Sequence, residues 1–180
     1  MLRREGMPVL IKRIVLGVLV LLVALLQNTD GLLPTFFSAR FFLLIPLSVC
    51  IGMYEGFMPG LVYGMVAGAF WDVCSSGADG MFALILAFAG FISGFLIKYV
   101  MRNKLLTQLC ITAFFSFATL ILHWLISVYI PLGDTDLRQL MLFYLPSAVI
   151  TLAVSFIIYF VVGFVCNTFN EKEARLNEVR

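Results

Sequence analysis

The chain has 180 residues, of which 62% are hydrophobic and 12% are charged, and its formal net charge is +2. Soluble domains carry about 25% charged residues, so the composition excludes a soluble globular protein and indicates an integral membrane protein. With helices of about 20 residues each, about five to seven spans would use the whole chain and leave no sizeable soluble domain.

Apolar runs separated by charged residues predict six transmembrane helices in one polytopic membrane domain, residues 1–180. The expected spans are 9–27, 38–54, 57–72, 80–98, 105–130 and 140–166, and residues 167–180 form a charged cytoplasmic tail. The predicted fold class is therefore an all-α integral membrane bundle. No A-x-A cleavage site follows the first apolar run, so we interpret that run as an uncleaved anchor rather than a signal peptide.

The second and third spans are short because Glu55, Gly56 and Pro59 divide one apolar stretch. They form either a tight helical hairpin or a single crossing with an irregular middle. Lys and Arg collect on the cytoplasmic side of short loops, and with a hairpin only Arg40 and Arg138 of the 12 basic residues face the other side. We therefore expect the hairpin, six spans, and both termini in the cytoplasm.

Glycine recurs at every fourth position along the second and third spans. The series is Gly52, Gly56, Gly60, Gly64 and Gly68, and the next step of four falls on Asp72. Glycine costs roughly 1 kcal/mol against alanine inside a helix, but in lipid small residues at this spacing allow a second helix to approach closely. Two interpretations stay open, since the ladder packs either within this chain or against another protein.

The fourth span carries a second face of small residues, which includes Gly90 and Gly94. The two small faces would pack on each other if the ladder is internal. Asp72 lies at the outer end of the third span, and a turn at Asp79 and Gly80 starts the fourth. We weigh a local capping or loop-bracing role for Asp72 against partner recognition or substrate chemistry.

His123, the sole histidine, lies in the fifth span. An ionisable residue inside a span is a functional candidate, but the sequence has no HExxH and no GxSxG motif. We expect a hydrogen bond across helices and no enzyme activity. Pro46 and Pro146 are expected to kink the second and sixth spans. The four cysteines form no CxxC pair, so we expect small core residues rather than a disulfide framework or metal site. They are Cys50, Cys74, Cys110 and Cys166.

Residues 56–84, GFMPGLVYGMVAGAFWDVCSSGADGMFAL, contain spaced glycines, an aspartate, a Ser-Gly turn and a glycine that opens a new span. This segment resembles the hallmark segment of the MreD family of bacterial rod-shape proteins. Chain length, six spans, a basic amino terminus and the basic loop from Lys98 to Lys104 agree with that family. The family often has another Gly or Pro where Ala78 and Asp79 stand. The matching positions are Gly60, Gly64, Gly68, Asp72 and Gly80.

The resemblance implies a non-enzymatic scaffold of the elongasome in the bacterial cytoplasmic (inner) membrane, with no cofactor, metal or nucleic-acid partner. It implies a fold similar to the six-helix substrate-binding subunits of energy-coupling-factor transporters. The implied partners are the single-span protein MreC, membrane lipid and, indirectly, MreB filaments and a RodA-type glycosyltransferase with its transpeptidase. The expected helix-packing or partner-binding residues are Gly56, Gly60, Gly64, Gly68, Asp72, Gly80, Gly90 and Gly94.

A substrate-binding subunit of an energy-coupling-factor transporter is the alternative, because size and span number agree. Such subunits typically carry an AxxxA face on the first span, whereas residues 14–26, IVLGVLVLLVALL, offer Gly17 and Ala24 but no such pair. Polar residues able to line a pocket are sparse. They are Glu55, His123, Tyr129 and Tyr144.

Overall fold

The computed structural model describes residues 6–29, 42–74, 80–125 and 145–178, and over these ranges the chain is all-helical, with no strand. Five of the six helices in these described ranges are long and apolar enough to cross a membrane. The sixth, α2, has 12 residues and is shorter. The helices are α1 (Gly6–Asn28), α2 (Leu44–Glu55), α3 (Phe57–Cys74), α4 (Met81–Tyr99), α5 (Leu105–Trp124) and α8 (Leu145–Glu178). The chain is therefore a multi-pass membrane protein.

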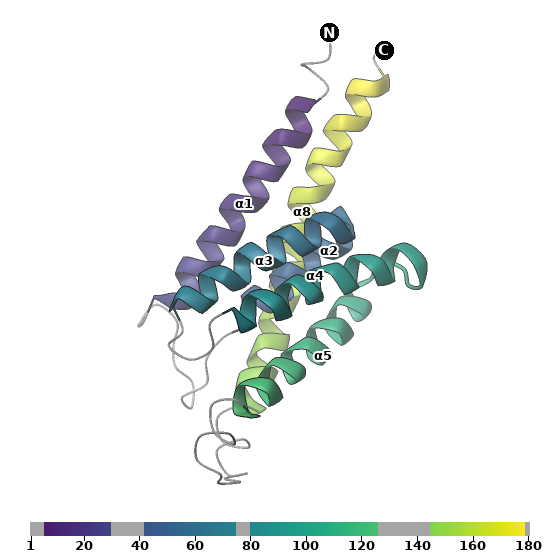
Figure 1. Cartoon of the computed structure of the whole chain (residues 1–180). Coiled ribbons are helices and arrows are strands. Elements are labelled where there is room, and N and C mark those ends of the chain that lie inside the picture. The colour runs from purple at the N-terminus through teal and green to yellow at the C-terminus, as the bar shows by residue number, and fades with distance from the viewer. Residues whose placement is uncertain (1–5, 30–41, 75–79, 126–144, 179–180) are drawn as a thin grey trace.

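Successive helices alternate in direction, so the start of α1 and the end of α8 lie at the same end of the molecule (Figure 1). Helices α1 and α8 extend beyond α2, α3, α4 and α5 at that end. Helix α8 has 34 residues, about 51 Å at 1.5 Å per residue, against a hydrocarbon core of about 30 Å. Its apolar part covers Val149–Asn170, and the helix continues without a break into the charged tail, to Glu178.

Helix α2 is the centre of the bundle. It contacts all five of the other helices, and its residues from Leu44 to Met53 are all buried. Two side chains from other helices satisfy the backbone amides at its start: Gln27 Oε1 accepts from Leu44 at 3.0 Å, and Thr151 Oγ1 accepts from Phe42 at 3.2 Å. A helix surrounded on every side needs no polar face, which explains why α2 is apolar all round.

Pro46 lies in the first turn of α2, where a missing N–H breaks no helical hydrogen bond. The kink predicted at Pro46 is therefore wrong. Pro46 was expected in a span interior because the apolar run alone gives no sign of where the helix begins. Residues 38–41, 126–130 and 140–144 of the expected spans lie outside the described residues. Of the residues directly before Pro146, only Leu145 is described, so the kink predicted at Pro146 stays a prediction.

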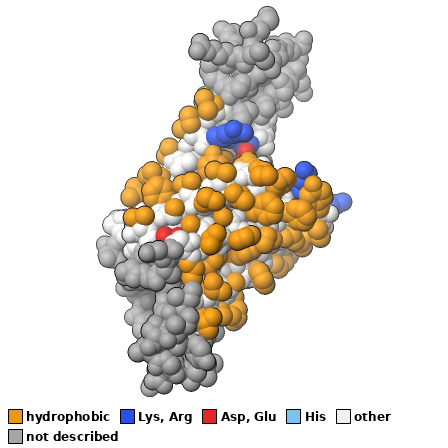
Figure 2. Space-filling view, in the orientation of Figure 1, with side chains coloured by type: hydrophobic (Ala, Val, Ile, Leu, Met, Phe, Trp, Pro, Cys, Tyr) orange, Lys and Arg blue, Asp and Glu red, His pale blue; other side chains and the backbone are white. Residues whose placement is uncertain are grey.

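The chain turns back between α2 and α3 at a single residue, Gly56. Its φ of +95° is in the region that favours glycine, and Glu55 and Phe57 on either side are already helical. Helices α2 and α3 then pack side by side, which is the tight hairpin rather than a stretch with an irregular middle. Figure 2 shows that hydrophobic side chains dominate the visible described surface, while Lys and Arg lie in its upper part.

Candidate functional site

The glycine ladder of α3 faces α4, and the closest approach is between Gly60 and Gly90. A Cβ on Gly60 would lie 2.5 Å from the carbonyl oxygen of Gly90 and 2.6 Å from the Cα of Gly52. A Cβ on Gly90 would in turn lie 2.6 Å from the carbonyl carbon of Gly60. No side chain fits between these backbones, so only glycine allows the three helices to meet here.

The same contact continues along both helices. A Cβ on Gly64 would lie 2.7 Å from the carbonyl carbon of Leu86, and one on Gly68 would lie 2.6 Å from the amide nitrogen of Ala83. At the other end, a Cβ on Gly94 would lie 2.5 Å from the amide nitrogen of Phe57. Five of the expected site residues therefore share one interface inside the chain, and the small faces of α3 and α4 pack on each other. These five are Gly60, Gly64, Gly68, Gly90 and Gly94.

Gly56 and Gly80 have a different role. Both have positive φ, +95° and +86°, and no described atom beyond the adjacent residues lies within 4 Å of where a Cβ would stand. Gly80 precedes α4 in the left-handed conformation, so these two glycines set the direction of the chain. The carbonyl carbon of Gly56 also lies against α4, 2.6 Å from where a Cβ on Gly94 would stand.

Asp72 caps α4 from the neighbouring helix. Its Oδ1 accepts a hydrogen bond from the amide of Phe82 at 3.1 Å, and its Oδ2 accepts one from Ala83 at 2.8 Å. Amides in the first turn of a helix have no partner within the helix, and a carboxylate there also interacts favourably with the helix dipole. The aspartate of the ladder thus holds the end of α3 and the start of α4 together.

Three aromatic rings stack on one another next to this cap. The Trp71 ring lies parallel to Phe82, with centroids 4.3 Å apart, and stacks on Phe42 at 5.2 Å. Trp71 is buried. Tryptophan near the end of a span is often an anchor at the membrane interface, whereas Trp71 packs inside the bundle against these two rings.

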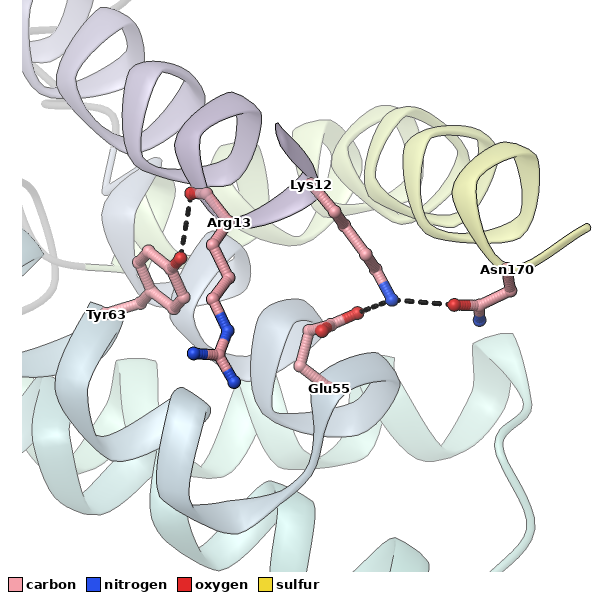
Figure 3. A network of polar contacts seen from close by, with 5 residues as sticks. All are labelled: Lys12, Arg13, Glu55, Tyr63 and Asn170. Atoms are coloured by element: carbon pink, nitrogen blue, oxygen red, sulfur yellow. Dashed lines mark hydrogen bonds and ion pairs between the residues drawn. The ribbon is translucent and has the colours of Figure 1, made fainter. Parts of the chain in front are cut away.

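At the end of the bundle where α1 starts, Lys12 connects three helices (Figure 3). Its ammonium forms an ion pair with Glu55 of α2 and donates a 2.7 Å hydrogen bond to Asn170 Oδ1 of α8. The side chains of Lys12 and Glu55 are only 9% and 14% exposed. The adjacent Arg13 accepts a 2.8 Å hydrogen bond at its backbone carbonyl from the Tyr63 hydroxyl of α3.

This network was missed from the sequence. Lys12 was counted with the basic amino terminus, and Glu55 was considered as a helix break and a pocket residue. The one available signal was an acid in an otherwise apolar stretch, since a charge at that place requires a partner. Nothing in the spacing identifies Lys12 as that partner, because the two residues lie on different helices. Asn170, which also binds Lys12, lies 158 positions from it.

The remaining polar candidates are divided between the described and undescribed parts of the chain. His123 is in the last turn of α5, but its side chain lies outside the described residues, as do Tyr129 and Tyr144. Cys50 and Cys166 are buried as expected, whereas Cys74 and Cys110 are exposed, so the expectation of four core cysteines is wrong for two. The sequence does not distinguish these two cysteines from the buried pair, because a small apolar side chain is compatible with either face of a membrane helix. Within the described ranges, no group of three or more His, Cys, Asp or Glu side chains could hold a metal ion.

No family model, curated protein or solved structure matches this chain.

Proposed function

We propose that this protein is a non-enzymatic membrane scaffold of the MreD type, which pairs with a single-span MreC-type protein and helps to position peptidoglycan synthesis. The supporting observation is that the segment with the glycine and aspartate pattern forms one structural unit. Gly60, Gly64 and Gly68 lie against the backbone of α4, and Asp72 caps that helix. Each of these residues, which match the MreD pattern, thus has a structural role that explains why a glycine or an aspartate stands there.

The partner helix docks, in this proposal, on an outward face of the bundle. The glycine face of α3 is unsuitable, because α4 already covers it. Helix α1 packs against α2, α3 and α8 on one side and presents on the other a stripe whose members are between 45% and 60% exposed. Their alternating spacing of three and four residues is that of a left-handed helix–helix contact. The stripe is Ile11, Ile14, Val18, Leu21 and Leu25.

Co-purification in mild detergent tests the proposal. A tagged MreC-type protein should recover the wild-type chain, and Val18→Trp in the middle of the stripe should reduce recovery several-fold. Val62→Trp is the matched control, since Val62 is 55% exposed on α3, as Val18 is 56% exposed on α1. A loss with Val62→Trp alone would move the docking face to α3 and leave the scaffold function standing.

Cell growth separates the scaffold from the transporter alternative. Depletion of a rod-shape scaffold should widen cells and disturb the incorporation of new wall material. Normal width and wall incorporation, together with failed uptake of one vitamin, would instead identify a transporter subunit. No recovery of the wild-type chain by an MreC-type partner would also count against the scaffold.

A further inference from the structure

Buried hydroxyl and amide side chains line the contact between α5 and α8. Each of these side chains is at most 3% exposed, and residues four apart lie on one face of a helix. We call this set the polar seam. Its members are Gln108, Thr112, Ser116 and Thr119 of α5 and Ser147, Thr151 and Ser155 of α8.

One set of hydrogen bonds fixes the register of the seam. Gln108 Nε2 donates to Ser155 Oγ at 2.6 Å and to the carbonyl oxygen of Ser155 at 3.4 Å. Because α5 and α8 run in roughly opposite directions (Figure 1), four residues forward on α5 correspond to four residues back on α8. Thr112 is therefore level with Thr151, and Ser116 is level with Ser147.

Some hydroxyls of the seam are satisfied within their own helix. Thr151 donates to the carbonyl of Ser147, and Thr119 donates to the carbonyl of Phe115, both at 2.7 Å. In contrast, Gln108 Oε1 and Ser116 Oγ accept or donate no hydrogen bond among the described residues, although both atoms are buried. The Cys50 thiol of α2 lies beside the Gln108 amide, and a thiol is only a weak donor. Exchanging the oxygen and nitrogen of the Gln108 amide would not help, because the nitrogen would then take the unpartnered position.

The chemistry of these two atoms defines what would satisfy them. An amide oxygen only accepts hydrogen bonds, whereas a serine hydroxyl both donates and accepts. The buried polar residues of α5 and α8 in the described ranges include no charged side chain, so an ion would meet no counter-charge in the seam. A neutral hydroxyl group fits both atoms.

We propose that the polar seam between α5 and α8 binds neutral hydroxyl groups, one donating to Gln108 Oε1 and one paired with Ser116 Oγ. The two positions are eight residues apart on α5, which is about 12 Å. Two ordered water molecules supply this chemistry, as does the glycerol headgroup of a neutral lipid at one of the two positions, since hydroxyls on neighbouring carbons do not span the distance between them. A buried water typically makes about three such hydrogen bonds. The site goes beyond a scaffold function, which requires no guest.

The test measures thermal stability of the purified full chain in lipid nanodiscs. Ser116→Ala removes a hydroxyl that makes no other hydrogen bond in the described structure. Any fall in melting temperature therefore reports on the hydroxyl group bound to Ser116. We expect the melting temperature to fall by roughly 2–6 °C. Thr119→Val is the matched control on the same face, because its hydroxyl is satisfied within α5, and it should change the melting temperature less.

Lipid composition distinguishes the two sources of the hydroxyl. A fall with Ser116→Ala in nanodiscs of phosphatidylcholine alone supports bound water. A fall that appears only when monoolein, a neutral lipid with free hydroxyls, is added supports the lipid headgroup, and native mass spectrometry should then show monoolein retained by the wild type.

One result overturns the proposal. If Ser116→Ala and Gln108→Met both melt at or above the wild-type temperature in both lipid mixtures, the two atoms are unpaired in a dry seam, because removing an unsatisfied polar atom costs nothing. Gln108→Met also loses the bond to Ser155, so its stability at or above wild type would be an especially strong contradiction. Neither measurement involves the partner protein, so this proposal and the scaffold proposal fail independently.

Discussion

The carboxylate of Asp72 accepts a 2.8 Å hydrogen bond from the backbone amide of Ala83, and so joins the end of α3 to the first turn of α4. The same Ala83 lies against Gly68, where a Cβ would come within 2.6 Å of its amide nitrogen. The cap and the glycine contact are therefore two parts of one joint. The ladder brings the helices close enough for the aspartate of α3 to reach the amides of α4.

Replacing Asp72 tests the cap. Asp72→Ala leaves the amides of Phe82 and Ala83 without their acceptor, and loss of a helix cap costs about 0.5–2 kcal/mol. Asp72→Asn keeps one oxygen acceptor and should retain part of this stabilisation. The measurement is the temperature at which half of the detergent-solubilised protein has aggregated. Size-exclusion chromatography quantifies the protein that stays in solution.

Partner capture by the same variants separates bracing from recognition. If Asp72 only braces the helices, Asp72→Asn should recover an MreC-type partner as well as wild type does. A protein that is stable with Asp72→Asn but fails to bind the partner would show that the carboxylate is itself a contact.

Alanine at Gly64 should destabilise the bundle even though alanine is the better helix former. A Cβ there meets the backbone of Leu86, which cannot move aside as a flexible side chain would, and overpacking costs about 1–3 kcal/mol. Gly17→Ala in α1 is the control. Its Cβ would lie 4.0 Å from the Tyr63 ring, an ordinary contact, so it should be neutral or stabilising by up to about 1 kcal/mol. Equal melting temperatures for the two variants would contradict the close α3–α4 contact.

The ion pair of Lys12 and Glu55 predicts that removing one charge destabilises the protein more than removing both. Removing one member, as in Lys12→Met, leaves a largely buried carboxylate without its counter-charge, which costs about 3–5 kcal/mol. The double variant Lys12→Met with Glu55→Leu should recover much of that loss, because apolar residues can replace a buried pair. Both are measured by the same aggregation temperature.

Arg13→Met is the control for charge alone. Arg13 is adjacent to Lys12 but exposed, and the bond from Tyr63 goes to its backbone carbonyl, which the substitution keeps. It should therefore melt close to wild type. A double variant as unstable as Lys12→Met would indicate that the two side chains contribute separately and not as a pair.

The apolar runs located the helices well where charges or turns bound them. The third and fourth spans were expected at 57–72 and 80–98, and the helices cover Phe57–Cys74 and Met81–Tyr99. Hydropathy also separates membrane from soluble proteins with little ambiguity. It does not show which face of a helix is inward, because lipid and a protein core are both apolar, and for this reason Cys74 and Cys110 were expected in the core.

The long-range contacts of polar residues depend on tertiary structure and were not predictable in the same way. The four-residue spacing of Gln108, Thr112 and Ser116 is present in the sequence, as is that of Thr151 and Ser155. Neither series identifies the other as its neighbour until the helix directions and the Gln108–Ser155 bond set the register. Small residues at regular spacing predict a close contact between helices. Isolated polar residues indicate that a hydrogen-bonding partner is required, but the sequence does not show which residue it is.

The two glycines with positive φ should respond to alanine in a fixed order. Gly56 has φ +95° and ψ 176°, a region that is essentially restricted to glycine, where another residue costs about 1–3 kcal/mol. Gly80 has φ +86° and ψ −4° in the left-handed region, where the cost is roughly 1–2 kcal/mol and asparagine is better tolerated. Among the described residues, no atom beyond the adjacent ones lies within 4 Å of either Cβ position, so we expect backbone strain to set the effect. Melting temperatures should therefore rise from Gly56→Ala to Gly80→Ala to Gly80→Asn, and a Gly56→Ala protein as stable as wild type would contradict the one-residue turn between α2 and α3.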